Sequence, residues 1–109
     1  MDFKVVWSPE AVEDIESIAE YISRDSQFYA SSVVTKIADF AGTLGRFPLI
    51  GRVVPELNDE TIRGRLACSY RIIYGVEKEG ILVPAVVHGK RLLESIRERL
   101  WPWAERPSR

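Results

Sequence analysis

The segment from Tyr70 to Arg91 has the pattern of two strands joined by a tight turn. β-Branched and aromatic residues dominate residues 70–76 and 81–87, and a short polar turn separates these two runs. Antiparallel pairing of such strands brings Arg71, near the start of the first, beside His88, at the end of the second. We therefore expect this hairpin to assemble a cationic cluster.

Composition places the chain among ordinary globular proteins. It has 109 residues, of which 46% are hydrophobic and 28% charged, so we expect one domain over residues 1–109 that ends in a tail of about nine residues containing Trp and Pro. No apolar run approaches the roughly 20 residues that a membrane span needs. We expect no signal peptide, no membrane contact and a cytoplasmic location. The single cysteine, Cys68, excludes an internal disulfide, and we expect it half-buried at a strand start rather than acting as a nucleophile.

Charge is distributed unevenly along the chain. Residues 1–60 carry 5 basic and 11 acidic side chains, a net charge of −6, whereas residues 61–109 carry 10 and 5, a net charge of +5. This division predicts either a basic face for an acidic partner or complementarity between helices and sheet. The net charge of −1 argues against a protein whose affinity depends on many phosphate contacts.

The first half of the chain predicts a strand followed by two helices. Alternation over residues 3–7 indicates a strand, and Ser8 then serves as the N-cap of a helix over residues 9–23. Ser26 caps a second helix that runs to Leu44, where Gly45 suits a left-handed C-terminal residue. The short link between the helices makes them an antiparallel hairpin. Their acidic residues are typical of a solvated face, including Asp14. The apolar stripes predicted to enter the core are Ala11, Ile15, Ile18, Ala19 and Ile22 in the first helix, and Ala30, Val33, Ile37, Phe40, Ala41 and Leu44 in the second.

The second half predicts an ordered loop and three strands. Residues 46–60 contain two prolines and no sustained period, yet they are too apolar for a solvated linker. Arg63 and Arg65 share one face of a strand that begins at Ile62. The last strand of the hairpin is apolar on both faces, which favours a central position, whereas Pro84 favours an edge or a bulge. A short helix over residues 92–100 and the tail complete an α+β domain of order β-α-α-β-β-β.

The candidate chemistry is limited to one basic cluster. The chain has no glycine-rich phosphate loop, and one His with one Cys cannot form a usual zinc site, so we expect no metal and no cofactor. Metal-free RNA cleavage through the 2′-hydroxyl needs a base, an acid and cations around the phosphorane. The cluster could meet part of that requirement, could bind an acidic protein surface, or could pair structurally with Glu56 or Asp59. Its expected members are Arg71, His88, Lys90 and Arg91, and Arg63 and Arg65 are candidates to lie near them.

Several short motifs, taken in order, resemble the RelE/ParE superfamily of bacterial toxins from type II toxin–antitoxin, or plasmid-stabilisation, systems. The resemblance spans residues 3–93. The segments that carry it are Trp7-Ser8-Pro9-Glu10-Ala11 with Asp14-Ile15, Ile18 and Tyr21-Ile22, then Phe47-Pro48, Gly51-Arg52, Val54-Pro55-Glu56-Leu57, Tyr70-Arg71-Ile72-Ile73-Tyr74 and His88-Gly89-Lys90-Arg91.

The resemblance implies a helical hairpin packed on a sheet, and a cognate antitoxin, encoded nearby, that neutralises the toxin. RelE-like members cut mRNA in the ribosome, whereas ParE-like members inhibit DNA gyrase and are not nucleases. Arg71 falls where RelE-like members place an active-site arginine, and Arg91 matches their cationic position after the last strand. The acid–base group of their last helix would fall near Arg97, and Asn58-Asp59-Glu60 replaces their basic loop.

The match to the nuclease branch is therefore incomplete, and the ParE-like branch is favoured: a toxin that arrests growth by inhibiting gyrase and is not an enzyme. Under this hypothesis the target-binding residues are Arg63, Arg65, Arg71, His88, Lys90 and Arg91. The alternative is a ribosome-dependent mRNA endonuclease with Arg71, His88 and Arg91 as catalytic residues. A second alternative is a non-toxic protein of the same fold that acts only through its partner. Trp101 and Trp103 are the predicted antitoxin contacts.

Overall fold

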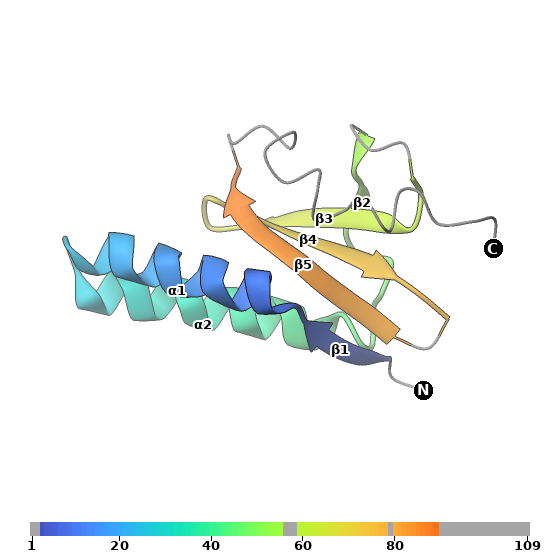
Figure 1. Cartoon of the computed structure of the whole chain (residues 1–109), viewed down its shortest axis with the longest axis horizontal. Helices are drawn as coiled ribbons and strands as arrows, with labels where there is room; N and C mark the ends of the chain where they lie inside the picture. Colours follow the sequence, from blue (N-terminus) through green and yellow to red (C-terminus); the bar gives the residue numbers. More distant parts are fainter. Residues whose placement is uncertain (1–2, 56–58, 79, 90–109) are drawn as a thin grey trace.

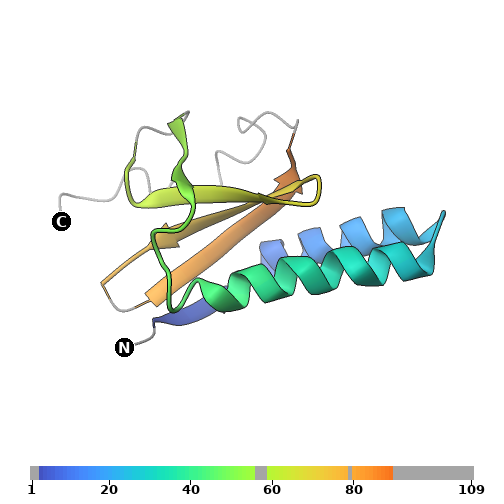
Figure 2. The ribbon, with the colours of Figure 1, turned by 180° about the vertical axis from the view of Figure 1, so that it is seen from behind.

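The computed structural model describes residues 3–55, 59–78 and 80–89. Two helices lie side by side along one face of a five-stranded sheet, and the tip of their hairpin extends past the sheet (Figures 1 and 2). In chain order the elements are β1 (Lys4–Trp7), α1 (Pro9–Ser23), α2 (Gln27–Thr43), β2 (Arg52–Val53), β3 (Ile62–Ala67), β4 (Tyr70–Val76) and β5 (Gly80–His88). This order confirms the predicted α+β fold, whereas the predicted C-terminal helix lies outside the described residues.

The sheet is mixed, with the strand order β1-β5-β4-β3-β2. β1 pairs with β5 in parallel, while the other three pairings are antiparallel. β2 is a two-residue strand inside the segment predicted to be a loop, and it pairs Arg52 with Gly64 and Val53 with Arg63. The central position predicted for the last hairpin strand is confirmed, because β5 lies between β1 and β4.

Helix caps form as the sequence predicts. The hydroxyl oxygen of Ser8 accepts a hydrogen bond from the Ala11 amide at 3.0 Å, and Ser26 accepts one from the Tyr29 amide at 3.0 Å. These bonds satisfy amides that have no partner within the helix. The Ser8 amide also donates to the Val83 carbonyl at 3.0 Å, and its hydroxyl donates to the Pro84 carbonyl at 3.2 Å. One residue therefore starts α1 and attaches it to β5.

The predictions for the backbone of Gly45 and for the burial of Cys68 are wrong. Gly45 has no positive φ; instead, a Cβ there would collide with the carbonyl oxygen of Phe3, whose amide donates to the Gly45 carbonyl at 2.8 Å. Gly45 is thus needed for close approach of β1 rather than for a left-handed turn. Cys68 is exposed in the two-residue turn between β3 and β4, not half-buried, and it adopts φ 59°.

The core has one apolar layer on each face of the sheet. The helix-side layer contains most of the predicted helical stripe together with strand residues such as Ile72, Tyr74 and Val86. The opposite face carries a smaller cluster. Because β5 contributes to both layers, it is apolar on both faces, as its sequence indicated. The smaller cluster consists of Val54, Ile62, Ile73, Ala85 and Val87.

Pro84 occupies a β-bulge in this central strand. In the register of β4 and β5, Gly75 faces Leu82 but Ile73 faces Ala85, so Val83 and Pro84 together oppose the single residue Tyr74. β1 ends at the pairing of Trp7 with Val83. The bulge therefore places proline, which cannot donate to a sheet, where no ladder bond is required of it. The sequence had left the choice between an edge and a bulge open.

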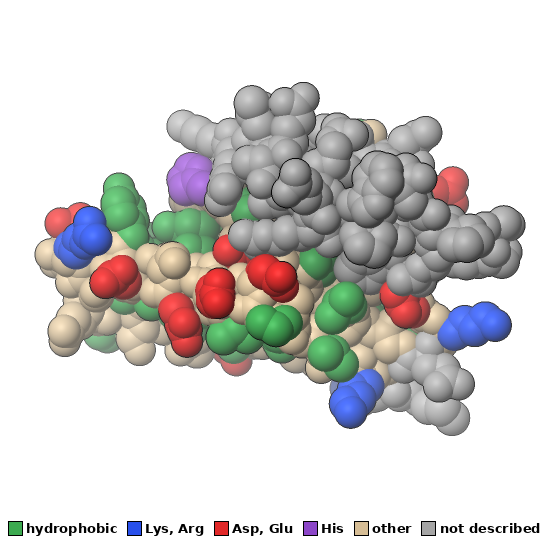
Figure 3. Space-filling model, viewed as in Figure 1, with side chains coloured by type: hydrophobic (Ala, Val, Ile, Leu, Met, Phe, Trp, Pro, Cys, Tyr) green, Lys and Arg blue, Asp and Glu red, His purple; other side chains and the backbone are tan. Residues whose placement is uncertain are grey.

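Asp14 accepts a hydrogen bond from a β5 amide that lies beyond the end of β1. Its carboxylate oxygen Oδ2 accepts a hydrogen bond from the buried amide of Val86 at 2.9 Å. The prediction that Asp14 belongs to a solvated face is therefore wrong, although Glu10, Glu13 and Glu16 are exposed. Figure 3 shows acidic side chains in a row over α1.

Replacing Asp14 with alanine is expected to lower the free energy of unfolding by about 2 kcal/mol, because the Val86 amide is then buried without an acceptor. Urea denaturation of the purified protein measures this change. Glu13→Ala is the matched control, since Glu13 is exposed on the same helix, and it should change stability by less than about 0.5 kcal/mol. Equal effects of the two substitutions would contradict a structural role for Asp14.

Candidate functional site: a cationic cleft on the sheet face away from the helices

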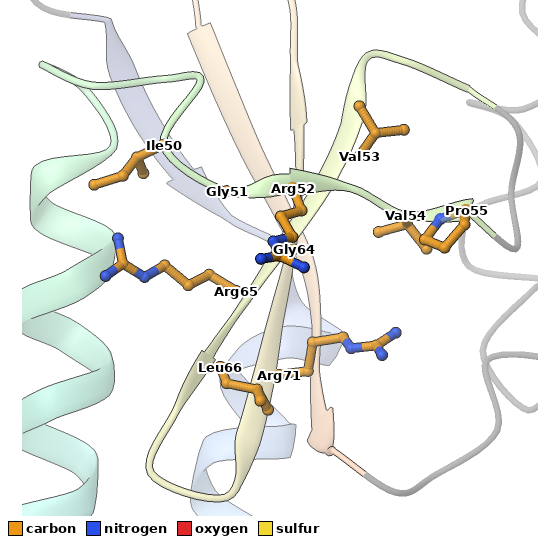
Figure 4. A pocket seen from close by; sticks show the side chains of 10 residues that line it. All are labelled: Ile50, Gly51, Arg52, Val53, Val54, Pro55, Gly64, Arg65, Leu66 and Arg71. Carbon is orange, nitrogen blue, oxygen red and sulfur yellow. The ribbon is translucent and has the colours of Figure 1, made fainter.

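A cleft of about 920 Å³ is formed by β2 and the residues around it together with β3 and the start of β4, on the sheet face away from the helices (Figure 4). Its walls are apolar residues of the loop and strands, and arginines supply its charge. Among the described residues that line it, none is a carboxylate or a histidine. The lining consists of Ile50, Gly51, Arg52, Val53, Val54, Pro55, Gly64, Arg65, Leu66 and Arg71.

Three arginines at this cleft point in different directions. In Figure 4, Arg52 projects over Gly64 in the middle of the cleft, Arg71 projects to one side, and Arg65 extends toward α2. The guanidinium carbon of Arg65 lies 5.1 Å from the ring centroid of Phe40, a cation–π arrangement that holds this side chain against the helix. Arg52 and Arg71 are therefore the charges best placed to meet a partner in the cleft.

The strand register divides the predicted basic cluster between the two sheet faces. Paired residues of an antiparallel sheet share a face, so Arg63 and Arg65, opposite Tyr74 and Ile72, lie on the helix side. They share a face with each other, as expected. Arg71 is paired with Leu66 and lies on the face away from the helices. The single cluster predicted from sequence is thus not assembled from these three arginines.

Arg63 serves the loop before β2. Its Nη1 donates hydrogen bonds to the Gly51 carbonyl at 2.8 Å and to the Leu49 carbonyl at 3.4 Å. Two carbonyls of one loop thereby share a single guanidinium group. These contacts give the Arg63 guanidinium a structural role. They also occupy the group that was predicted to bind the target.

His88 lies on the face opposite Arg71. It pairs with Tyr70, and the two rings meet edge to face with centroids 5.5 Å apart, whereas Arg71 pairs with Val87. The hairpin does bring the strand ends together, as predicted, but alternate residues of a strand point to opposite faces. Arg71 and His88 therefore do not share a site, although both make other interactions within the protein.

The bulge at Pro84 is the cause of this separation. Without the extra residue, the register that pairs Gly75 with Leu82 would continue along both strands and pair Arg71 with Val86. His88, two residues after Val86, would then lie on the same face as Arg71. A shift of one residue reverses every side chain beyond it. One inserted residue in β5 thus places His88 beside Tyr70 and leaves the Arg71 face without a histidine from this strand.

The two tyrosines of β4, Tyr70 and Tyr74, lie on the helix-side face and stay neutral at physiological pH because their pKa values are raised. Burial raises the pKa of Tyr70, and the neighbouring hydroxyls of Tyr21 and Tyr29 raise it further. Burial also raises the pKa of Tyr74, against smaller opposing effects of its bond to Gly51 and of nearby arginines. Neither hydroxyl is tuned toward the neutral pKa that suits a general base.

The sequence interpretation missed two residues that shape the cleft. Arg52 was part of a recognised motif but was given no role. Its position after a glycine in an ordered loop could have identified it as a candidate binding residue. Tyr74 was also part of a recognised motif without a role, yet its hydroxyl accepts from the Gly51 amide at 2.8 Å and donates to the Pro48 carbonyl at 3.0 Å. A buried tyrosine generally finds such a partner.

Other predicted site residues lie outside the described part of the chain: Lys90, Arg91, Trp101 and Trp103. Among the described residues, no group of three or more His, Cys, Asp or Glu side chains is placed to hold a metal ion. No helix in the described ranges is long and apolar enough to cross a membrane.

Three solved structures share this arrangement of helices and strands with the chain. A chain from the chromosomal ParDE system of Pseudomonas aeruginosa is 16% identical, with a TM-score of 0.66, and the match covers 79% of this chain and 95% of that one. One from the RelBE2 toxin–antitoxin complex of Mycobacterium tuberculosis is 19% identical, with a TM-score of 0.59 and coverage of 81% and 99%. The Staphylococcus aureus YoeB dimer gives 19% identity, a TM-score of 0.58 and coverage of 81% and 98%. These likenesses show the fold.

Sequence comparison assigns the family. No curated protein matches the chain. The family model described as the ParE toxin of the type II toxin–antitoxin system, parDE, matches residues 5–93, which include every described helix and nearly all of the sheet. The chain therefore belongs to the ParE toxin family of type II toxin–antitoxin systems.

Proposed function

We propose that this ParE family toxin inhibits DNA gyrase and contacts it through the cationic cleft. The observation that carries the proposal is the placement of Arg71 and His88 on opposite faces of the sheet. An RNase that acts through the 2′-hydroxyl needs a base and an acid beside the cations that stabilise the phosphorane. The described lining residues are cations and apolar side chains, and the one histidine lies on the other face, which favours binding over cleavage.

The cleft also has the character of a protein-binding surface. Arg52 and Arg71 project from apolar surroundings that include Ile50, Val53 and Leu66. Arginine among exposed apolar side chains is typical of the residues that dominate protein–protein affinity. Complementary charge would steer the encounter with an acidic surface of gyrase.

Type II systems pair a toxin with a cognate antitoxin, so this chain has an antitoxin as a partner. We propose that the antitoxin neutralises the toxin and that its contacts include Trp101 and Trp103, as predicted from sequence. These two residues lie outside the described residues, so the proposal depends on their aromatic character between prolines.

The purified protein is expected to inhibit gyrase-catalysed supercoiling of relaxed plasmid at micromolar concentration, and addition of the cognate antitoxin should restore supercoiling. Primer extension on cellular transcripts after toxin induction provides the contrasting measurement, because a ribosome-dependent nuclease leaves codon-phased cuts. Normal supercoiling together with such cuts would overturn the gyrase proposal. Inhibition of gyrase with intact transcripts would support it.

A further inference from the structure

The loop between α2 and β2 presents apolar side chains to solvent. Phe47, Leu49 and Ile50 are 52%, 64% and 44% exposed, and they fall within four consecutive residues. Leu66 on β3, which lines the same cleft as Ile50, is 61% exposed. Contiguous exposed apolar side chains of this kind mark a docking surface more often than isolated ones do. We call residues 47–50 the apolar loop.

The backbone of the apolar loop is bound to the body of the protein. Tyr74 accepts from the Gly51 amide and donates to the Pro48 carbonyl, so one buried hydroxyl spans both ends of the loop. Arg63 binds the Gly51 and Leu49 carbonyls from the adjacent strand. A turn bond from the Ile50 amide to the Phe47 carbonyl, at 3.2 Å, closes the loop internally.

These bonds turn the backbone polar groups of the loop toward the protein and leave its apolar side chains facing solvent. Folding normally favours burial of apolar side chains. The loop cannot turn Leu49 and Ile50 inward without losing contacts to Tyr74 and Arg63. A rigid apolar surface loses little conformational entropy when a partner covers it. The arrangement is therefore preorganised for binding.

Charge around the loop indicates what kind of partner fits. Arg46 and Arg52, both exposed, flank the apolar loop in sequence, and Arg71 lies across the cleft from Ile50. A partner that covers the apolar side chains must place groups near the guanidinium ions of Arg46 and Arg52. Carboxylates satisfy them, whereas basic residues would be repelled.

We propose that the apolar loop is the anchor by which this toxin docks on gyrase, and that gyrase receives it in an apolar pocket bordered by carboxylates. This inference rests on the proposed function and specifies the chemistry of the partner surface. The loop is continuous with the cationic cleft through Ile50, which favours the target of the cleft over another partner.

The test compares two double variants of the full chain, with gyrase binding measured by isothermal titration calorimetry. Leu49→Ala with Ile50→Ala is expected to weaken gyrase binding at least tenfold, because the anchor is truncated in a central position. The matched control, Val6→Ala with Val12→Ala, truncates two valines of 45% and 43% exposure on β1 and α1, and should stay within about twofold of wild type. Circular dichroism confirms that both variants fold.

Wild-type protein that does not bind gyrase would overturn the proposed function itself. Wild-type binding with no loss in the loop variant would overturn only the present inference. So would a loop variant that loses affinity for the antitoxin alone. A salt titration tests the carboxylate border: wild-type affinity should fall as ionic strength rises, and affinity independent of salt would contradict it.

Discussion

Replacing Gly51 with alanine is expected to destabilise the protein by about 3 kcal/mol, the upper range for forcing an extra methyl group into a packed site. A Cβ at Gly51 would lie 2.7 Å from the Tyr74 hydroxyl oxygen and 2.9 Å from the Gly64 carbonyl oxygen. The Gly64 carbonyl belongs to the sheet and cannot move aside. The Tyr74 hydroxyl can move only by releasing its bonds to the loop.

Gly42→Ala provides the matched control, with an effect of opposite sign. Nothing lies within 4 Å of a Cβ at Gly42, which is exposed within α2. Alanine there should stabilise the helix by about 0.5–1 kcal/mol. Denaturant unfolding of both variants measures the pair. Destabilisation of similar size in both would contradict the close approach between the loop and β3.

The Gly51 substitution also bears on binding. If the loop is released from Tyr74, its apolar side chains lose their fixed arrangement, and gyrase affinity should fall even at temperatures where the variant remains folded. Tyr74→Phe removes the hydroxyl without changing the buried ring, so it separates loop anchoring from core packing.

Reversing the charge of Arg71 is expected to have the largest effect on activity. Arg71→Glu should raise the toxin concentration needed to inhibit gyrase about 100-fold, because a like charge facing an acidic partner costs several kcal/mol. Arg71→Gln, which keeps the length and loses the charge, should have an intermediate effect. Supercoiling assays with each purified variant measure the change.

Arg24→Glu is the control for this charge reversal. Arg24 is exposed in the link between the helices, at the end of the hairpin far from β2. The same change of net charge there should leave inhibition within about twofold of wild type, since exposed charges beyond a Debye length are screened. A folded Arg71→Glu protein that inhibits as well as wild type would exclude Arg71 from the contact.

The sequence predicted the parts of the fold that depend on local physics. Ser8 and Ser26 act as caps within three residues, and the apolar stripes of the helices follow a period that is independent of distant contacts. The hairpin of β4 and β5 followed from residue type and a short turn. β2 was missed because a two-residue strand has no period to detect.

The candidate site was predicted only in part. Arg71 was identified and lies at the cleft, but Arg63 and Arg65 bind the loop and Phe40 instead, on the other face of the sheet. Asp14 was assigned to solvent because its role depends on where β1 ends relative to Val86, far away in sequence. Such contacts follow from tertiary register, which a residue pattern does not contain.

Local sequence patterns were enough to predict the helical hairpin, the strand pair and the basic residues near the end of that pair. The sheet face that each basic residue occupies depends on the register of distant strands. The deciding element is the bulge at Pro84, where one extra residue moves His88 to the face of Tyr70 and leaves Arg71 on the other. β5 is apolar on both faces, so its pattern reads the same with or without the inserted residue, while the side-chain period of two makes the outcomes opposite.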